Sequence, residues 1–307
     1  MLFSYTRMYH ARTMSEPWTV EALIDLGERV LSDSSHIFED HDNAAESHEL
    51  LAHTLDVDED SLDDEDIVPR RDAEHYLSLI ARRAGGEPFP FLTGHIEFWG
   101  LDLQVSPGAF VPRPSSELAV QRALKRLGKK KNATVVDVCT GAGPIALALG
   151  DELPNAEVWG ADILDEGLQQ GRRNAKRLGI SNVTLKQSDM YNGLPARLKG
   201  KVDLITGHVP YVPPDEVDDL PAEVREFEPI ETLTDASADG LFLMRRAIEE
   251  APEWLKPGGW LLLEVSDDLP PKLRKLVREA GLEDKGAASD EDELSVIIEA
   301  RKPLGRN

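Results

Sequence analysis

The sequence predicts an α/β protein in which a mainly parallel sheet, covered by helices on both faces, follows a small helical domain. Residues 18–86 show helical patterns without a convincing strand pattern, whereas strand-like and helix-like segments alternate after about residue 115. Such alternation implies right-handed crossovers between parallel strands. A chain of 307 residues is also long enough to bury two separate cores.

Hydrophobic periodicity places the individual elements. In the helical domain, helices are expected at residues 20–31, 43–55 and 72–83. In the α/β domain, strands are expected at residues 134–138, 157–161, 183–186, 202–206, 260–265 and 294–300, with helices from Pro144, at 165–178, at 239–255 and ending near Gly281. The segment 207–235 has no strong periodicity, and a loop of this length inside a compact domain is expected to be functional.

These patterns divide the chain into four parts. Residues 1–17 are expected to be a disordered extension or a misassigned start, and residues 18–90 a helical domain. Residues 91–114, which mix aromatic and β-branched residues with glycines, are expected to form a linker hairpin. Residues 115–303 then form the α/β domain, in which a Pro257-Gly258-Gly259 turn precedes the strand at 260–265.

Composition narrows the class of protein. The formal net charge of −23 would repel a phosphate backbone, so nucleic acid is a poor candidate partner. No apolar run approaches the roughly 20 residues that span a bilayer, and we expect no membrane association. Cys139 is the single cysteine, and the His and acidic residues show no metal-ligand spacing. We therefore expect a cytoplasmic protein that has neither disulfides nor a metal site.

The clearest local signal is a short run of small residues between a strand and a helix. Asp137 lies in the strand, and Cys139, Thr140, Gly141, Ala142 and Gly143 follow it. Small residues at this place let the backbone turn sharply and approach a ligand at a helix N-terminus. The dinucleotide spacing Gly-x-Gly-x-x-Gly and the lysine of a P-loop are both absent, which weakens the NAD and ATP interpretations.

Acidic residues follow the next two strands. Asp162 ends the second strand, where a carboxylate can accept hydrogen bonds from both ribose hydroxyls of an adenosine-containing cofactor. Asp189 and Met190 follow the third strand, within reach of an adenine amino group by the same topology. The residues thus predict a nucleotide-like cofactor at the carboxyl edge of the sheet.

Further motifs precede the loop from Asp137 to Gly143, namely Phe91-Leu92-Thr93-Gly94, Glu97-Phe98-Trp99 and Val111-Pro112-Arg113-Pro114. Together with that loop, they resemble the HemK/PrmC family of S-adenosylmethionine-dependent protein-glutamine methyltransferases. The resemblance extends from about residue 43 to residue 300. It implies a class I methyltransferase fold, Rossmann-like and seven-stranded, behind a small N-terminal helical domain. It also implies S-adenosyl-L-methionine as the cofactor, bound near Cys139 to Gly143, Asp162, Asp189 and Met190.

The resemblance further implies a protein substrate. The family methylates glutamine amides, notably in the Gly-Gly-Gln loop of peptide release factors, and a related branch modifies a ribosomal protein. Its catalytic motif is Asn-Pro-Pro-Tyr after the fourth strand, with the Asn accepting a hydrogen bond from the target amide. This chain has His208, Val209, Pro210 and Tyr211 at these positions. The resemblance therefore implies catalytic roles for His208, Pro210 and Tyr211, with His208 also beside the cofactor.

The histidine leaves three interpretations open. His208 replaces Asn in an active amide methyltransferase, because a neutral imidazole still accepts one hydrogen bond. Alternatively, it serves a changed acceptor, such as a small molecule or the amino group of a nucleic-acid base, as a general base. In the third interpretation the protein binds S-adenosylmethionine and transfers little. The sequence does not indicate an oligomeric state.

Overall fold

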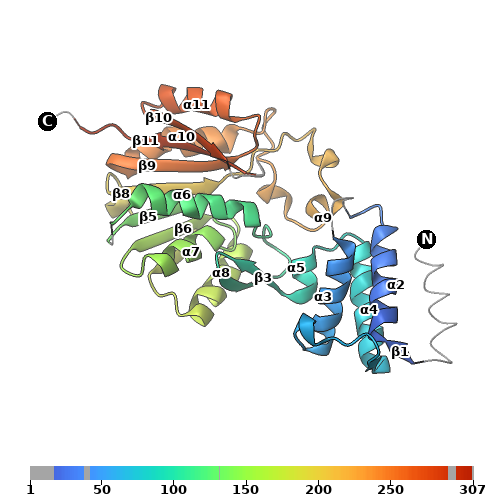
Figure 1. Ribbon diagram of the computed structural model, residues 1–307. Coiled ribbons are helices and arrows are strands. Elements are labelled where there is room, and N and C mark those ends of the chain that lie inside the picture. Colours follow the sequence, from blue (N-terminus) through green and yellow to red (C-terminus); the bar gives the residue numbers. More distant parts are fainter. Residues whose placement is uncertain (1–16, 38–41, 131, 290–294, 306–307) are drawn as a thin grey trace. The chain divides into compact units, whose positions relative to one another are not determined.

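The computed structural model describes residues 17–37, 42–130, 132–289 and 295–305 (Figure 1). The expected N-terminal extension, residues 1–17, lies outside the described residues apart from Pro17. The chain divides into two compact units. The helical unit comprises the chain up to Gly94 together with Leu220–Phe227, and the sheet unit comprises His95–Asp219 and Glu228–Asn307.

Three amphipathic helices form the core of the helical unit. They are α2 (Val20–Ser32), α3 (Asn43–Leu55) and α4 (Arg70–Ala84), and the expected helix at residues 43–55 is confirmed to its ends. Two very short strands that the sequence pattern did not indicate, β1 (Trp18–Thr19) and β2 (Ile67–Val68), pair antiparallel. The 3-10 turn η1 (Glu59–Ser61) precedes β2, and the short helix α5 (Phe89–Thr93) ends the continuous part of the unit.

A glycine lets the three helices approach closely. A Cβ atom at Gly27 of α2 would lie 2.0 Å from the Tyr76 hydroxyl oxygen and 2.3 Å from the Ser47 hydroxyl oxygen. Tyr76 and Ser47 are fully buried, their hydroxyls lie 2.7 Å apart, and the Tyr76 hydroxyl donates to the Leu23 carbonyl. Every polar group of this contact therefore has a partner, as burial demands.

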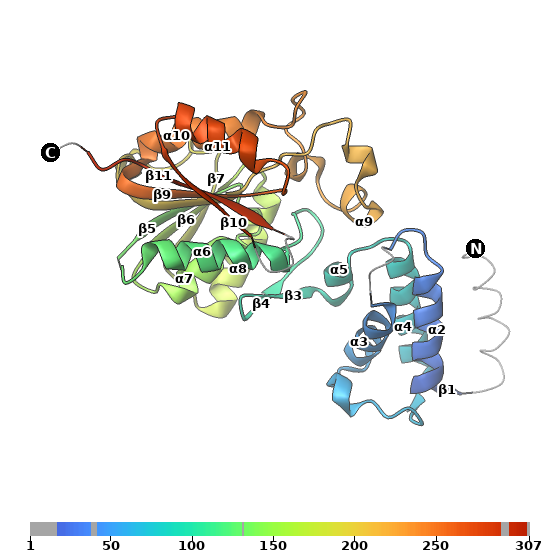
Figure 2. The same ribbon diagram turned by 45° about the horizontal axis from the view of Figure 1, so that its top comes forward.

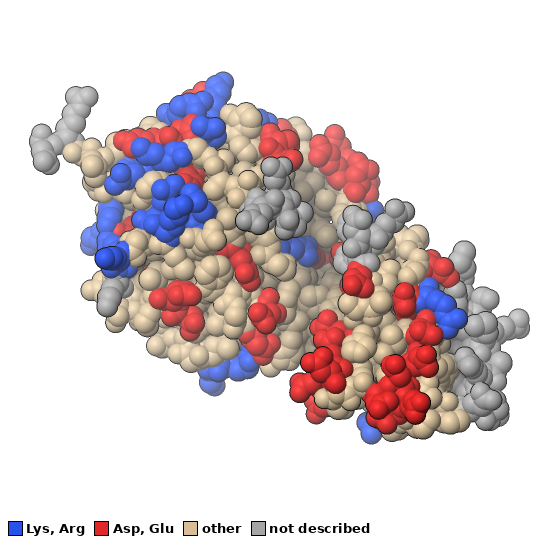
Figure 3. Space-filling view, viewed as in Figure 1, with Lys and Arg blue, Asp and Glu red and all other residues tan. Residues whose placement is uncertain are grey.

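The surface of the helical unit is strongly acidic between α3 and β2. Figure 3 shows acidic side chains gathered on the visible face of this unit. Asp56, Asp58, Asp60 and Glu65 are among the exposed acids of this segment. The segment accounts for part of the charge of −23. No described helix is long and apolar enough to cross a membrane.

The sheet unit is built on seven strands in the order β10-β11-β9-β8-β5-β6-β7 (Figure 2). Their bounds are β5 (Thr134–Val138), β6 (Glu157–Asp162), β7 (Val183–Gln187), β8 (Val202–His208), β9 (Leu255–Val265), β10 (Glu283–Ser289) and β11 (Val296–Arg301). The first five are parallel, and β11 and β10 are antiparallel additions at one edge. The predicted class of a mainly parallel α/β fold is confirmed.

Helices cover both faces of this sheet, so its central strands are buried throughout. One face packs on α6 (Glu117–Leu127), α7 (Pro144–Glu152) and α8 (Asp165–Leu178), and the other packs on α10 (Phe242–Trp254) and α11 (Pro270–Glu279). Neighbouring side chains of β5 alternate between the two cores, with Val135 in one and Val136 in the other. The remaining short elements are the hairpin β3 (His95–Phe98) and β4 (Leu101–Gln104), the 3-10 turns η2 (Pro114–Ser116), η3 (Ala196–Leu198), η4 (Val217–Asp219) and η5 (Ile230–Thr232), and α9 (Ala222–Arg225).

Three local features differ in detail from what the sequence pattern indicated. The linker does contain a hairpin, but it spans only β3 and β4, because Pro88 and Pro90 begin the helix α5 before it. Pro257-Gly258-Gly259 is not a turn before a strand, since β9 runs through it with a register shift against β8. The strand β10 was missed, because its sequence Glu283-Asp-Lys-Gly-Ala-Ala-Ser has low strand propensity. Its pairing with β11 holds it in the sheet.

A buried arginine joins a distant segment of sequence to the helical unit. Arg83 is fully buried, and its Nε lies 2.7 Å from a Glu46 carboxylate oxygen. Its Nη1 lies 2.8 Å from a carboxylate oxygen of Glu223, which belongs to α9. The segment Leu220–Phe227 thus belongs to this unit although it follows the fourth parallel strand of the sheet. The position of Leu220–Phe227 therefore depends on the ion pairs that the buried Arg83 forms with Glu46 and Glu223.

Replacement of Arg83 by Ala is expected to destabilise the helical unit by about 3–5 kcal/mol, because two carboxylates would lose their buried partner. Hydrogen exchange measured by mass spectrometry should show faster exchange in α3, α4 and Leu220–Phe227. The neighbouring Arg82→Ala is the control, because Arg82 is 47% exposed in its ion pair with Glu87 and its loss should cost less than about 1 kcal/mol. Equal effects of the two substitutions would contradict the structural role of Arg83.

Candidate active site

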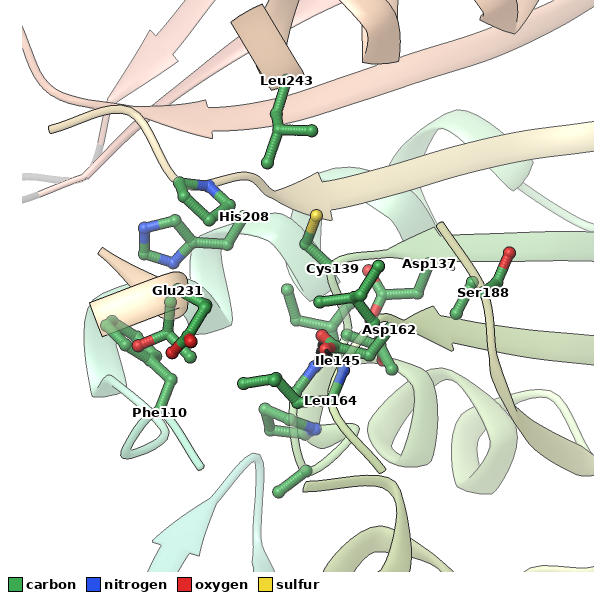
Figure 4. Close-up of a pocket in the computed structure, with 18 of the residues that line it drawn as sticks. Phe110, Asp137, Cys139, Ile145, Asp162, Leu164, Ser188, His208, Glu231 and Leu243 are labelled. Carbon is green, nitrogen blue, oxygen red and sulfur yellow. Dashed lines mark hydrogen bonds between the residues drawn. The ribbon is translucent and has the colours of Figure 1, made fainter. Parts of the chain in front are cut away.

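A pocket lies at the carboxyl ends of the parallel strands, where the strand order reverses between β5 and β8 (Figure 4). Open α/β sheets bind ligands at this switch point, because the loops on its two sides diverge to opposite faces. In Figure 4, His208, Phe110 and Glu231 lie to one side of the pocket, and Asp137, Asp162 and Ser188 lie to the other.

The buried side chain of Asp137 anchors the loop that follows β5. This carboxylate is 1% exposed, and it accepts hydrogen bonds from the Thr140 hydroxyl at 2.5 Å and the Thr206 hydroxyl at 2.7 Å. Burial raises the pKa of Asp137 to about 6, against the lowering effect of the two hydroxyls. Cys139 and Gly141 have φ angles of 53° and 55°, so the backbone turns through the left-handed region.

Close packing of α8 fixes the same loop from a second side. A Cβ atom at Gly171 would lie 2.4 Å from the Ala142 carbonyl oxygen, and one at Gly167 would lie 2.9 Å from the Gly141 carbonyl carbon. A Cβ at Gly160 of β6 would lie 2.9 Å from the Thr140 hydroxyl oxygen. Gly167 and Gly171 let the helix touch the loop backbone directly, and Gly160 lets the strand approach the Thr140 side chain.

Asp162 connects the end of β6 to the loop. One of its oxygens accepts from the Gly141 N–H at 2.7 Å, and the other accepts from the Leu164 N–H at 2.9 Å. Burial raises the pKa of Asp162, while these backbone donors oppose the shift. The Ile163 N–H also donates to this carboxylate, so about one of its roughly four acceptor positions is left for a ligand hydroxyl.

The segment after β7 forms another wall. Met190 has a φ of 50°, and its carbonyl accepts from the Ser188 hydroxyl at 2.6 Å. Asp189 is half exposed and bound to Arg246 at 2.6 Å. The Cys139 sulfur lies 3.8 Å from the Met190 sulfur, and burial raises the pKa of the thiol well above its usual value. Cys139 is therefore a neutral wall residue and not a nucleophile.

His208 is the last residue of β8 and lies between two aromatic rings. Its ring centroid lies 5.3 Å from that of Phe110 in an edge arrangement, and 6.0 Å from that of Tyr211 in a stacked arrangement. Burial raises the pKa of Tyr211 to about 12, and repulsion by Glu264 and Asp268 adds to this shift. The Tyr211 hydroxyl is consequently neutral near pH 7, so the stacked ring adds no charge beside the imidazole.

Among the described residues that line the pocket, Arg113 is the one that carries a guanidinium, and its charge is already compensated. It forms an ion pair with the buried carboxylate of Glu228. Its guanidinium carbon also lies 4.5 Å from the centroid of the Phe110 ring. The pair fixes Phe110, which in turn contacts His208.

The structure brings most of the predicted site residues together. Asp137, Cys139, Thr140, Gly141, Ala142, Asp162, Asp189, Met190, His208 and Pro210 all line the pocket. Gly143 lies beneath the loop as the cap of α7, and Tyr211 contacts the imidazole instead of lining the pocket. Sequence reasoning did not select Phe110, Arg113, Ser116, Ile163, Leu164, Glu231 or Thr232, which also line it. Pro112-Arg113 was a visible motif, whereas the others carry no local signal.

The lining suits an adenosine-containing cation. The described lining includes four acidic residues, Asp137, Asp162, Asp189 and Glu231, of which Asp137 is buried and Asp189 is paired with Arg246. The basic residue in this described lining, Arg113, is paired with Glu228. Such a lining disfavours phosphates and favours a positively charged group. A Cβ atom at Gly141 would meet no described atom within 4 Å, so there is room above the loop. Among the described residues, no cluster of three or more His, Cys, Asp or Glu could hold a metal.

The seven-stranded sheet with a pocket at its switch point, together with the comparisons below, makes this chain a class I S-adenosylmethionine-dependent methyltransferase. A family model described as a methyltransferase domain matches residues 129–300. The release factor glutamine methyltransferase of Moorella thermoacetica is 38% identical over 220 residues, covering 71% of this chain and 75% of that protein. The enzyme of the same description from Pseudomonas aeruginosa is 40% identical over 217 residues, covering 71% and 76%. A solved methyltransferase structure from Pyrococcus furiosus covers 67% of this chain and 90% of its own, with 18% identity and a TM-score of 0.48.

The chain belongs to the family of release factor glutamine methyltransferases. The resemblance seen in the sequence motifs is thereby confirmed, and S-adenosylmethionine is the cofactor of the family.

Replacement of Gly171 by Ala is expected to weaken S-adenosylmethionine binding by about tenfold or more, because the new methyl group must displace the Ala142 carbonyl. Alanine otherwise favours a helix over glycine by about 1 kcal/mol, so the two effects have opposite signs. Isothermal titration calorimetry measures the binding. The exposed Gln169→Ala on the same helix is the control, and unchanged affinity in Gly171→Ala would show that the contact does not shape the loop.

Replacement of Asp137 by Asn is expected to remove a pH dependence of stability. The folded-state pKa of about 6 lies above the ordinary 3.8, so the wild-type protein loses stability as pH rises from about 4 to about 6. The loss is about 3 kcal/mol for this group, and the Asn variant should lack it. Denaturant unfolding of both proteins across this range, without cofactor, measures the difference. Parallel pH profiles would contradict the assignment.

Proposed function

We propose that this chain transfers the methyl group of S-adenosylmethionine to the side-chain amide nitrogen of a glutamine in a protein, with the Gly-Gly-Gln loop of a peptide release factor as the acceptor. The observation that carries the proposal is the position of His208. It ends β8 beside the pocket, on the side opposite Asp162. This is the place at which an acceptor would meet a cofactor bound over the loop after β5.

The cofactor would lie against the loop from Cys139 to Gly143. The Asp162 carboxylate would accept a hydrogen bond from a ribose hydroxyl at the acceptor position that its three backbone donors leave free. Asp189 and Met190 would bound the adenine. When bound, S-adenosylmethionine supplies an electrophilic methyl group on a positively charged sulfur.

His208 would hold the acceptor amide. Its unprotonated ring nitrogen would accept a hydrogen bond from the glutamine side-chain N–H and so direct the nitrogen toward the methyl group. The rings of Phe110 and Tyr211 restrict rotation of the imidazole. The amide nitrogen would gain the methyl group and release one proton to solvent water, while the sulfur would keep the electrons of the broken C–S bond. Alignment, more than acid-base chemistry, is the contribution of the protein in this scheme.

We further propose that the helical unit docks the protein substrate. The chain runs from Tyr211 through η4 to Leu220–Phe227, which is part of the helical unit, and then re-enters the sheet unit at Glu228. The same loop thus bears the acceptor-binding residues at one end and a segment of the helical unit at the other. In this view the domain assignment of residues 18–90 and 115–303 describes a docking part and a catalytic part.

Labelled methyl transfer from S-adenosylmethionine to a purified release factor tests the proposal. The natural protein and His208→Asn are both expected to label the Gly-Gly-Gln glutamine. Asp162→Ala should reduce cofactor affinity by about 10- to 100-fold through loss of hydrogen bonds to a charged group. A release factor with the target glutamine changed to alanine is the substrate control.

Two outcomes would count against a release-factor acceptor. If only His208→Asn transfers label, the fold serves a different natural acceptor, such as a small molecule or a base amino group. If neither protein transfers label while both bind cofactor, the release-factor assignment is wrong.

A further inference from the structure

A buried glutamate lies directly behind His208. Glu264 is the cross-strand neighbour of His208 in the parallel pair β8 and β9. Its side chain is 5% exposed, and its Oε2 lies 3.5 Å from the imidazole Nδ1. The other oxygen, Oε1, accepts a hydrogen bond from the Ser295 hydroxyl at 3.0 Å. Glu264 thus connects the candidate acceptor site to Ser295, the residue just before β11, through one side chain.

One oxygen of the Glu264 carboxylate lacks a hydrogen-bond donor among the described residues. Oε2 is buried and accepts no hydrogen bond from the residues that the structure describes. A buried acceptor without a donor costs free energy, and a carboxylate costs more than a neutral group. The His208 Nδ1 atom is the potential donor next to Oε2. The two atoms lie 3.5 Å apart, slightly farther than in an ordinary hydrogen bond. The contact therefore favours a proton on Nδ1.

A proton on Nδ1 decides what the other ring nitrogen can do. A neutral imidazole carries a single N–H, and the partner of one nitrogen selects the tautomer. If Nδ1 donates to Glu264, Nε2 keeps its lone pair and acts as an acceptor. The flanking rings of Phe110 and Tyr211 limit rotation that would exchange the two nitrogens.

We propose that Glu264 is a positioning residue that holds His208 in the Nδ1–H tautomer, so that Nε2 accepts the N–H of the substrate amide. This inference rests on the proposed function and explains how a histidine does the work of an amide oxygen. It also specifies the acceptor chemistry. The group opposite Nε2 must donate a hydrogen bond, so a glutamine amide fits, whereas a glutamate carboxylate would meet a lone pair with the negative charge of Glu264 behind it.

The first test reads the tautomer without any assay of activity. The full chain is labelled with ¹⁵N-histidine, and the His208 signals are assigned by their absence in His208→Asn. With the imidazole neutral, the wild-type spectrum should show Nδ1 protonated and Nε2 unprotonated. Glu264→Gln should increase the Nε2–H population, because the Gln amide can donate as well as accept. A wild-type Nε2–H tautomer would overturn the proposal.

The second test measures turnover. Glu264→Gln should lower kcat by about 10- to 100-fold, the range for carboxylates that orient metal-bound histidines, with little change in KM for the protein substrate or in cofactor affinity. In a His208→Asn background, which has no tautomers, the same substitution should have no further effect on kcat. An equal loss in both backgrounds would show that Glu264 acts on the fold and not through His208.

Glu299→Gln is the matched control for burial of a glutamate in this sheet. Glu299 lies on β11, is 2% exposed and pairs with Arg122 and Arg126. Its replacement should lower the melting temperature but leave the His208 tautomer unchanged. If release factor is not the acceptor, the turnover test fails for every variant, but the NMR test still decides the role of Glu264. A changed tautomer in Glu299→Gln would contradict the specific contact.

Discussion

The buried carboxylate of Asp137 is the interaction on which the site depends. It holds the Thr140 hydroxyl of the loop after β5 and the Thr206 hydroxyl of β8. A single side chain therefore fixes the two sides of the switch point, the loop expected to cradle the cofactor and the strand that ends in His208. Burial makes ionisation of Asp137 costly, and the hydrogen bonds from the Thr140 and Thr206 hydroxyls offset part of this cost.

Around that contact, the side of the pocket that we propose for the cofactor is held by backbone and small residues. Gly160, Gly167 and Gly171 bring a strand and a helix against the loop, and Asp162 binds two backbone N–H groups. The acceptor side is held differently, by the rings of Phe110 and Tyr211 and by ion pairs such as that of Arg113 with Glu228. This division suits a constant cofactor and an acceptor whose recognition depends on side chains.

The pairing of β8 with β9 places Glu264 beside His208. In the related motif an asparagine presents an oxygen that needs no tautomer, whereas an imidazole presents an acceptor only if its proton is held on the other nitrogen. Glu264 lies beside Nδ1 because His208 and Glu264 are register partners on adjacent parallel strands. The glutamate and the histidine are 56 positions apart in sequence, yet the strand pairing makes them one functional group in our proposal.

The sequence by itself determined the class of fold, most of its elements and the chemistry of the cofactor loop. Periodicity located the helices at Asn43–Leu55 and Asp165–Leu178 to their ends, because amphipathic stripes and caps are local signals. The residues of the loop from Cys139 to Gly143 were likewise readable, since small residues between a strand and a helix have few other uses.

Only the tertiary structure decided the rest. The strand β10 is held by its partner β11 and not by propensity. Pro257 to Gly259 form an irregular part of β9, because its pairing with β8 passes from Leu255 directly to Trp260. The membership of Leu220–Phe227 in the helical unit and the contact of Glu264 with His208 are long-range pairings. A glutamate inside the apolar run Leu261 to Val265 was a visible anomaly, but sequence gives no distances, and the partner of a buried charge is chosen by packing.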